Sequence, residues 1–415
     1  MGDNPPFLIS WNITRRCNLR CGHCYLDADE LGGADPVDTV RALGFVDEIA
    51  DLTPGGAMLI LTGGEPLLRE DLPEISSHAA ARGLVVVVGT NGTLLDDRSV
   101  AMLRDGGVAG VGISVDSASP AVHDRLRGVE GSWRATLEGV EALRRGGLDF
   151  QLQFTVTRES SREIGDVIAL GAELGARAVN IFFLVCTGRG QRMTDLSSDE
   201  YEEVLHAIVE AEREYAGRIM VRARCAPHVL RVARRANPGS ALLRGETSGC
   251  IAGTGYLRIS PEGYVTPCPY IPYGPASPQL GKESLRAIWE RDPMMRSLRE
   301  PRYTGTCGDC EFNDVCGGCR ARALASGGDL MGEDDWCGYE PEGPPARGGG
   351  GGSVADSKAA GPVWTAEARE RLGRVPSFLR PMVRRGLERY ARAMGIAEIT
   401  PELMAELRRR QKDGR

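Results

Sequence analysis

The sequence predicts an α/β protein in three parts: a partial (β/α)6 barrel, a cysteine-rich iron–sulfur segment and a small α-helical C-terminal domain. Three observations predict this organisation. Short apolar runs alternate with amphipathic stretches over the first half of the 415 residues. The chain has 12 cysteines, of which three lie close together near the start and seven lie between residues 250 and 337. A glycine-rich stretch then precedes the last fifty or so residues.

The barrel prediction depends on six apolar runs that we interpret as strands. Amphipathic helical stretches at 37–51, 70–82, 134–145 and 160–174 lie between them. The runs are apolar rather than strictly alternating, which is typical of parallel strands covered by helices. A closed eight-stranded barrel would need two more β/α units, so a six-unit partial barrel fits better. The predicted strands are 7–13, 57–61, 84–89, 108–115, 149–157 and 178–185.

Composition and charge limit the partners of the chain. The net charge of −7 disfavours nucleic acid or an acidic membrane surface as a partner. The longest apolar runs, such as 178–186, are much shorter than the roughly 20 residues of a membrane helix. The first residues show no signal peptide, so we expect a cytoplasmic protein. Disulfides are rare in that compartment, and clustered cysteines there indicate metal or redox chemistry.

Changes in composition suggest four parts of the chain. Residues 1–220 form the barrel and 221–342 the cysteine-rich segment, which lacks long periodic stretches and needs metal to hold it together. Residues 343–361 form a glycine-rich linker. Residues 362–415 form the small helical domain, which carries a net charge of about +6.

The first cysteine group has the spacing C-x3-C-x2-C and follows the first predicted strand. Cys17, Cys21 and Cys24 can hold three irons of a [4Fe–4S] cluster and leave the fourth iron open to a chelating ligand. Loops after parallel strands carry the active sites of such folds. The alternatives are a zinc site or three structural thiols. Structural zinc takes four ligands, and His23 is awkwardly placed as the fourth.

A second motif, Thr-Gly-Gly-Glu-Pro at 62–66, ends the second predicted strand. Together the two motifs resemble the radical S-adenosylmethionine (AdoMet) superfamily over about residues 7–190. The resemblance implies that Cys17, Cys21 and Cys24 bind the reducing cluster and that reductive cleavage of AdoMet yields a 5′-deoxyadenosyl radical. It also implies an electron donor such as ferredoxin or flavodoxin. The positions that it assigns to AdoMet are Gly63, Gly64, Glu65 and Pro66 at the amino group, Asn91, Ser114 and Asp116 near the carboxylate and ribose, and His23 beside the adenine.

The second cysteine group resembles the SPASM extension of radical AdoMet enzymes, which carries two auxiliary clusters. The resemblance implies that one cluster has four cysteine ligands and the other has three. One departure is that two residues, rather than three, separate Cys316 and Cys319. A single cluster or a zinc fold is the alternative. The implied ligands are Cys307, Cys310, Cys316 and Cys337 for one cluster and Cys250, Cys268 and Cys319 for the other.

The three-ligand cluster leaves one iron whose partner the spacing does not define. That iron is either open to a substrate group or capped by another residue, with Cys225 and His228 as candidates. The simpler interpretation of His228 is a satisfied core or surface histidine. The simpler interpretation of Cys186 and Cys225 is that they are small buried apolar residues.

The substrate class rests on further resemblances. WNITRRCNLRCGHCYLDA and CGDCEFNDVCGGCRARA resemble the radical AdoMet proteins of haem-d1 and alternative haem biosynthesis. The tail from residue 363 resembles the small C-terminal domain of a light-independent protochlorophyllide reductase subunit. These resemblances imply a tetrapyrrole substrate, with a peptide or protein maturase and a non-catalytic cluster scaffold as alternatives. Arginines of the tail could meet porphyrin propionates or could only solvate the domain; they are Arg374, Arg380, Arg384 and Arg385.

Overall fold

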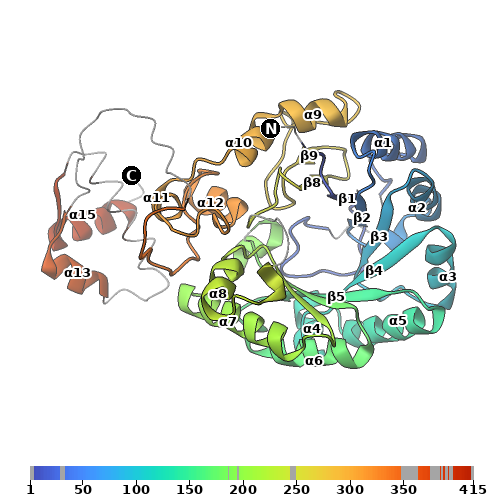
Figure 1. The fold of residues 1–415 in the computed structure, drawn as a ribbon, viewed down its shortest axis with the longest axis horizontal. Helices are drawn as coiled ribbons and strands as arrows, with labels where there is room; N and C mark the ends of the chain where they lie inside the picture. The colour runs from blue at the N-terminus through green and yellow to red at the C-terminus, as the bar shows by residue number, and fades with distance from the viewer. Residues whose placement is uncertain are drawn as a thin grey trace. The chain divides into compact units, whose positions relative to one another are not determined.

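The computed structural model describes residues 4–28, 33–185, 187–193, 196–243, 249–346, 363–373, 384, 387, 391 and 396–412. Figure 1 shows the course of the chain. The chain divides into two compact units. The large unit contains most of the chain up to residue 349, and the small unit contains the C-terminal region.

A curved sheet of nine strands organises the large unit. Seven of its strands are parallel and follow one another in chain order across the sheet. The six predicted strands are all present, and the α/β prediction with a partial barrel is confirmed. The seven strands are β1 (Leu8–Thr14), β2 (Met58–Gly63), β3 (Val85–Thr90), β4 (Val108–Ser114), β5 (Phe150–Val156), β6 (Ala178–Phe183) and β7 (Met220–Arg224).

The sheet extends beyond the six strands that the sequence predicts. β7 adds to β6, while β8 (Tyr256–Ile259) pairs in parallel with β1 and β9 (Val265–Thr266) pairs antiparallel with β8. β7 contains two arginines, and β8 and β9 are only four and two residues long. None of the three therefore has the apolar run that reveals a buried parallel strand.

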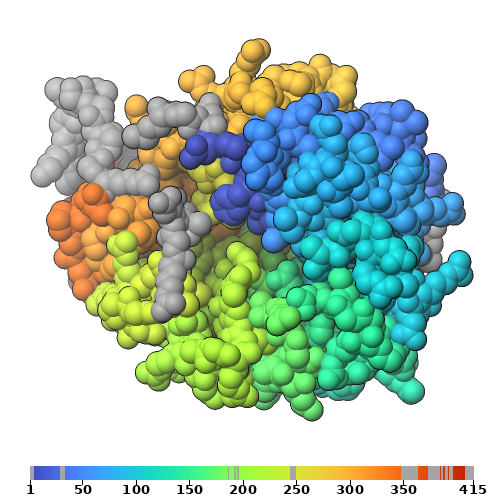
Figure 2. All heavy atoms as spheres, turned by 45° about the vertical axis from the view of Figure 1, so that its right-hand side comes forward, coloured from blue at the N-terminus to red at the C-terminus, as the bar shows by residue number. Residues whose placement is uncertain are grey.

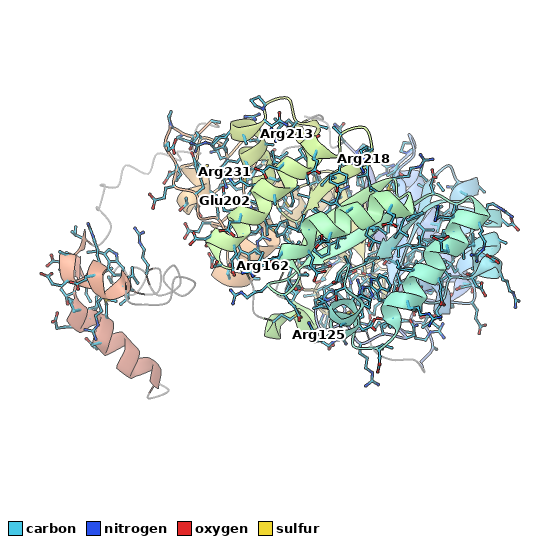
Figure 3. The ribbon with its side chains drawn as sticks, turned by 90° about the horizontal axis from the view of Figure 1, so that it is seen from below. Arg125, Arg162, Glu202, Arg213, Arg218 and Arg231 are labelled. Atoms are coloured by element: carbon cyan, nitrogen blue, oxygen red, sulfur yellow. The ribbon has the colours of Figure 1, made fainter. Side chains whose placement is uncertain are left out.

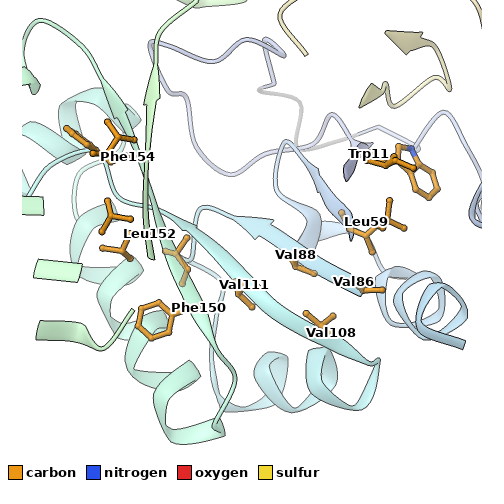
Figure 4. Packing of buried hydrophobic residues seen from close by; sticks show 14 of the residues in the cluster. Trp11, Leu59, Val86, Val88, Val108, Val111, Phe150, Leu152 and Phe154 are labelled. Carbon is orange, nitrogen blue, oxygen red and sulfur yellow. The ribbon is translucent and has the colours of Figure 1, made fainter. Parts of the chain in front are cut away.

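Helices cover the outer face of the sheet (Figure 1). Their apolar sides pack on side chains such as Trp11, Leu59, Val86, Leu152 and Phe154, all fully buried (Figure 4). The other face of the sheet therefore lines the interior of the partial barrel. The helices are α1 (Thr39–Leu52), α2 (Leu72–Ala81), α3 (Asp97–Asp105), α4 (Pro120–Arg127), α5 (Ser132–Gly146), α6 (Ile164–Leu174), α7 (Ser198–Glu214) and α8 (His228–Ala236).

The cysteine-rich segment belongs to the same large unit because β8 and β9 continue the barrel sheet. Its helices are short and separated by loops, in agreement with the lack of long periodic stretches. Glu48 of α1 accepts a hydrogen bond from the backbone N–H of Leu285, which attaches this segment to the barrel. The helices are α9 (Leu285–Arg291), α10 (Pro293–Arg299), α11 (Gly305–Gly308) and α12 (Arg320–Gly327).

The C-terminal unit has its own small core. It contains α13 (Ala366–Gly373) and α15 (Pro401–Lys412), and it adds a short parallel pair of strands that the prediction of a helical domain did not include, β10 (Val363–Trp364) and β11 (Glu398–Ile399). Its buried side chains include Trp364, Ala368, Leu387, Ala391 and Ile399. In the described part of the chain, no helix combines the length and the apolarity that crossing a membrane requires.

Candidate metal and cofactor site

The first cysteine group lies in the loop that follows β1, at the carboxyl end of the barrel strands. Cys17 and Cys21 are buried, and Cys24 packs against the same small apolar cluster. Burial raises the pKa of Cys17 to about 12, with added repulsion from the other two cysteines and Glu65. Without metal the Cys17 sulfur is therefore a thiol. Binding to iron would deprotonate it.

Two arginines distant in sequence hold this loop in place. Arg189 donates from Nε to the Cys21 carbonyl over 2.9 Å, and its backbone N–H donates to the Cys24 carbonyl. Arg127, the last residue of α4, donates from Nη1 to Cys21 Sγ over 3.7 Å. The loop also donates backbone N–H groups from Arg20 and Gly22 to the carbonyls at the end of α4. Hydrogen bonds from Arg189 and from the end of α4 therefore fix the conformation of the loop that carries the three cysteines.

The two glycines after β2 are required by close backbone approach. A Cβ on Gly63, whose φ is 150°, would lie 2.5 Å from the Thr14 carbonyl oxygen, and a Cβ on Gly64 would lie 2.2 Å from that of Arg16. The backbone of the Gly-Gly-Glu-Pro motif therefore packs directly on the start of the cysteine loop. Pro66 begins the single 3-10 turn Pro66–Leu68.

Glu65 is fully buried and connects this motif to the next strand end. Its carboxylate accepts hydrogen bonds from the Thr90 hydroxyl at 2.7 Å and from the Asn91 N–H at 2.9 Å. Burial raises its pKa to about 7, although these hydrogen bonds oppose the rise. Asn91 in turn donates to the Asn18 side chain between Cys17 and Cys21. The glutamate, the Asn-Gly turn and the cysteine loop therefore form one connected site.

Asp116 lies just beyond the end of β4, beside the same loop. Its side chain is fully buried, lies 2.7 Å from Arg127 Nη2 and 3.3 Å from His23 Nε2 and accepts the Thr155 N–H. Burial lowers the pKa of His23, and Asp116 opposes that effect. His23 Nδ1 is buried without a hydrogen-bond partner among the described residues. Ser114, the last residue of β4, is half-buried two positions away.

The second cysteine group separates into two clusters of side chains. The first contains four cysteines whose mutual charge repulsion adds to the effect of burial on their pKa values. Burial raises the pKa of Cys337 to about 12. Gly317 and Gly318, which stand in the shortened gap before Cys319, both have positive φ, at 60° and 66°. The four cysteines are Cys307, Cys310, Cys316 and Cys337.

The other cluster brings Cys225 together with three of the predicted ligands. Cys225 follows β7, and it packs with Cys268 against buried Cys319. Burial raises the pKa of Cys225 to about 12, and charge on Cys319 and Cys250 raises it further. The backbone of Cys225 has a φ of 59°, a left-handed conformation that non-glycine residues adopt rarely. The structure therefore places a fourth thiol beside Cys250, Cys268 and Cys319.

His228 instead belongs to a buried polar network. Its Nδ1 is 2.8 Å from the Tyr201 hydroxyl, and its Nε2 is 3.6 Å from Asp334. Asp334 forms an ion pair with Arg322 and accepts the Cys319 N–H at 2.7 Å. The network supports the start of α12 beneath Cys319. His228 is buried within it, and its Nε2 has no hydrogen-bond partner among the described residues.

Sequence reasoning missed Arg127 and Arg189, which stand 106 and 168 residues from Cys21. No local signal marks either residue, since arginine near the end of a helix is ordinary. Cys186 lies outside the described residues. Within the described part of the chain, no three His, Cys, Asp or Glu side chains are arranged around a single metal-ion position. The donor chemistry, three thiols on one loop and two sets of four beyond it, fits iron–sulfur clusters.

Comparison with known protein families matches three parts of the chain. Residues 11–170 match the Radical SAM superfamily, and residues 250–311 match the SPASM iron–sulfur cluster-binding domain. Residues 364–408 match the 57 kD subunit of proto-chlorophyllide reductase. All three resemblances noted in the sequence are confirmed.

Curated relatives share most of their length with this chain. The AdoMet-dependent heme synthase of Methanosarcina barkeri is 40% identical over 347 residues, which cover 81% of this chain and 98% of the relative. The pre-heme d1 synthase of Dinoroseobacter shibae is 30% identical over 359 residues, which cover 80% of this chain and 86% of the relative.

Among solved structures, Streptococcus suis SuiB bound to S-adenosylmethionine superposes with a TM-score of 0.66 and 15% identity, covering 81% of this chain and 78% of that chain. SuiB has also been solved bound to its precursor peptide SuiA. At this identity the likeness is one of fold.

Proposed function

This chain belongs to the radical SAM superfamily, in its SPASM-domain group with the AdoMet-dependent heme synthases, and from this premise we propose that it modifies a side chain of a tetrapyrrole in haem or haem-d1 biosynthesis. Its cofactors are [4Fe–4S] clusters and AdoMet. The observation that carries the substrate proposal is the 40% identity over nearly the whole length of a heme synthase. The proto-chlorophyllide reductase match in the tail adds a second tetrapyrrole context.

We assign the first cluster to Cys17, Cys21 and Cys24. Bound there, the cluster and AdoMet would supply reductive cleavage of the sulfonium C–S bond and a 5′-deoxyadenosyl radical. The loop that carries the three sulfurs is closed by Arg127 and Arg189, and it leaves one cluster iron for AdoMet. Two features of the loop support this assignment: its position after β1 and the burial of its sulfurs.

We propose that Glu65 orients AdoMet by accepting hydrogen bonds from its amino group. The Thr90 and Asn91 donors hold the carboxylate in place. The glycines before it let the backbone of the motif pack directly on the start of the cysteine loop. Asn91, Ser114, Asp116 and His23 lie around the same strand ends, where we assign them to the carboxylate, ribose and adenine of AdoMet.

We assign Cys307, Cys310, Cys316 and Cys337 to one auxiliary cluster. We assign Cys250, Cys268 and Cys319 to the other, with Cys225 as its fourth ligand. The packing of Cys225 beside Cys268 and Cys319 supports that fourth ligand. The left-handed backbone of Cys225 also supports this assignment. Backbone strain of this kind costs about 1–3 kcal/mol and persists only where the surrounding structure requires it.

The experiment that tests the function is anaerobic turnover of the reconstituted protein with AdoMet, a strong reductant and candidate porphyrins, followed by mass spectrometry. We expect 5′-deoxyadenosine and a porphyrin whose mass has changed by loss or rearrangement of a side chain. Deoxyadenosine without any altered porphyrin would contradict the tetrapyrrole proposal. It would then favour the peptide or protein maturase, which a short precursor peptide encoded next to this protein would support. Absence of AdoMet cleavage would favour a scaffold.

A further inference from the structure

The last strand of the barrel, β7, carries two arginines on one face. Arg222 and Arg224 are two positions apart, so their side chains leave the same side of the strand. Val221, which precedes Arg222, is buried, and Ala223, which lies between the two arginines, packs against the main core. The apolar positions and the arginines therefore point to opposite faces.

The register of the sheet shows that the arginine face is the interior of the barrel. Arg222 pairs with Asn180 of β6 and Arg224 pairs with Phe182. The neighbouring Val179 faces the outer helix α6, because a Cβ on Gly171 of that helix would lie 2.8 Å from its side chain. Asn180 therefore faces inward, where it donates to Gln151 of β5 and accepts from Arg224 Nε at 3.2 Å.

Neither arginine has an acidic partner within the described part of the chain. The side chain of Arg224 makes one hydrogen bond, to the neutral amide of Asn180, and among the described residues the side chain of Arg222 makes none. Both side chains are partly buried. Two like charges on a partly desolvated wall are unfavourable unless an anion lies between them.

Three buried arginines of the same unit have a carboxylate partner, in contrast to Arg222 and Arg224. Arg231 of α8 binds Glu202 of α7 with two hydrogen bonds of 2.9 and 2.6 Å, and Figure 3 labels this pair. Arg127 and Arg322 pair with Asp116 and Asp334. The protein thus supplies a carboxylate to these three guanidinium groups. On the inner face of β7 it does not.

Figure 2 shows a recess between the dark blue segment near the N-terminus and the green and yellow-green segments, the colours of residues from about 150 to 235. At the other end of the curved sheet, Arg258 of β8 also lies inside the barrel, because it donates to Asn12 of β1. Its Nη1 is buried without a hydrogen-bond partner among the described residues. Both ends of the sheet therefore present guanidinium groups to the interior without acidic partners.

We propose that Arg222 and Arg224 form a subsite that binds a carboxylate of the substrate inside the barrel. Guanidinium groups bind carboxylates through forked, charge-assisted hydrogen bonds, and two of them on adjacent inward positions can share one carboxylate or bind two. The inference rests on the proposed function, in which the substrate is a porphyrin that carries several propionates. The subsite lies at the β7 end of the sheet and the AdoMet positions at β1 to β4, so the substrate would be anchored opposite the radical source.

The test is equilibrium binding of iron-coproporphyrin and of its tetramethyl ester, followed by absorbance on the holoenzyme. We expect the Arg222→Gln/Arg224→Gln variant to bind the acid at least tenfold more weakly than the wild type, because each guanidinium loses its charge-assisted hydrogen bond to the carboxylate. We expect Arg222→Lys/Arg224→Lys to retain part of that affinity. The wild type should prefer the acid over the ester, and the glutamine variant should lose this preference. Arg218→Gln, an exposed residue before β7 (Figure 3), is the control for net charge.

Three outcomes overturn the subsite. They are unchanged acid affinity in the glutamine variant, an equal loss in Arg218→Gln, and a loss of AdoMet affinity that matches the loss for porphyrin. The third would assign the arginines to the cofactor. Iron content and the unfolding midpoint show whether each variant is folded. If the wild type binds neither porphyrin, the proposed function fails as a whole. If it binds the acid and the variants do not differ, only the subsite fails.

Discussion

Arg320 donates a hydrogen bond from Nη2 to the sulfur of Cys307 over 3.8 Å, and its side chain is 1% exposed. Its other hydrogen bonds go to the backbone carbonyls of Gly318, Leu330 and Gly332. Within the described residues, no carboxylate forms an ion pair with it. Burial raises the pKa of Cys307, and the charge of Arg320 opposes that rise. A buried cation needs a compensating anion, which the thiolate of Cys307 would supply.

This relationship predicts that Arg320 sets the reduction potential of the cluster assigned to Cys307. Replacing Arg320 with Gln removes a positive charge beside the sulfur, so reduction of the cluster becomes less favourable. A hydrogen bond to a charged group is worth about 1.5–3 kcal/mol, and 1.4 kcal/mol corresponds to about 60 mV for one electron. We therefore expect the potential to fall by about 60–120 mV in a titration followed by electron paramagnetic resonance.

Two variants serve as controls for that titration. Arg320→Lys keeps the charge, so its potential should lie between those of the wild type and Arg320→Gln. Arg235, which is exposed on α8, should tolerate Gln without a measurable shift. An unchanged potential in Arg320→Gln with full iron content would show that the hydrogen bond to sulfur has no influence on the cluster.

We expect AdoMet cleavage to depend on the first cysteine group and not on the two auxiliary clusters. Replacing Cys17, Cys21 and Cys24 with Ala removes all cysteine ligands of one cluster, so 5′-deoxyadenosine should no longer form. Three cubane clusters correspond to about twelve irons per chain, and about eight should remain in the variant. Chromatography measures deoxyadenosine, and a colorimetric assay measures iron. Residual cleavage would refute the assignment, and stoichiometric zinc with about four irons in the wild type would indicate a zinc fold at 250–337.

The sequence was sufficient to predict the six strands β1 to β6, because buried parallel strands are visible as apolar runs. The four helical stretches named from the sequence do not include α3 or α4, which are amphipathic but polar on average and only nine and eight residues long. The sequence did not indicate β7, since Arg222 and Arg224 interrupt its apolar pattern. Those arginines face the interior, so the missed strand is also the one that carries the proposed subsite.

The site was harder to predict wherever two distant segments meet. Arg127 reaches Cys21 across 106 residues, and Cys225 meets Cys268 because the end of β7 approaches the loop after β9. Cysteine spacing reveals ligands that share a loop, such as Cys307 and Cys310. It cannot reveal a ligand that comes from another strand. The sequence therefore left the cap of the three-ligand cluster open between Cys225, His228 and a substrate group.

The assignment of Cys225 predicts a spectroscopic change. In Cys225→Ala one iron loses its protein ligand and becomes labile, so mild oxidation should yield a [3Fe–4S] signal and the loss of about one iron per chain. The wild type should retain the cubane under the same oxidation. His228→Gln should leave the signal unchanged, because His228 is bound to Tyr201 and Asp334 instead. Identical spectra for Cys225→Ala and wild type would leave that iron to a substrate group or another ligand.

The buried pair of Asp116 and Arg127 predicts a large loss of stability. Asp116→Asn leaves the guanidinium buried without its counter-ion, and breaking such a pair costs about 3–5 kcal/mol. The matched control is Asp97→Asn, whose pair with Arg145 is mostly exposed and should contribute less than about 1 kcal/mol. Anaerobic urea unfolding measures both free energies. Equal shifts in the two variants would mean that the Asp116 pair is no more important to stability than a surface pair.

The C-terminal unit provides the last prediction. It has its own buried core around Trp364 and Ile399, and the predicted linker at 343–361 falls mostly outside the described residues. If its basic face guides a propionate-bearing substrate, a chain of residues 1–345 should remain folded with full iron content but bind porphyrin more weakly. Arg384→Glu/Arg385→Glu should reproduce part of that loss, more strongly at low salt, because screening is then weaker.

Arg384 is exposed on this unit, whereas Arg374, Arg380 and Arg385 lie outside the described residues. Arg369→Glu, which changes an exposed arginine of α13, distinguishes a specific face from net charge. Absorbance titration of the full and shortened chains decides between guidance and docking. If their porphyrin affinities are equal and only turnover with a physiological electron donor falls, the unit docks a partner protein instead.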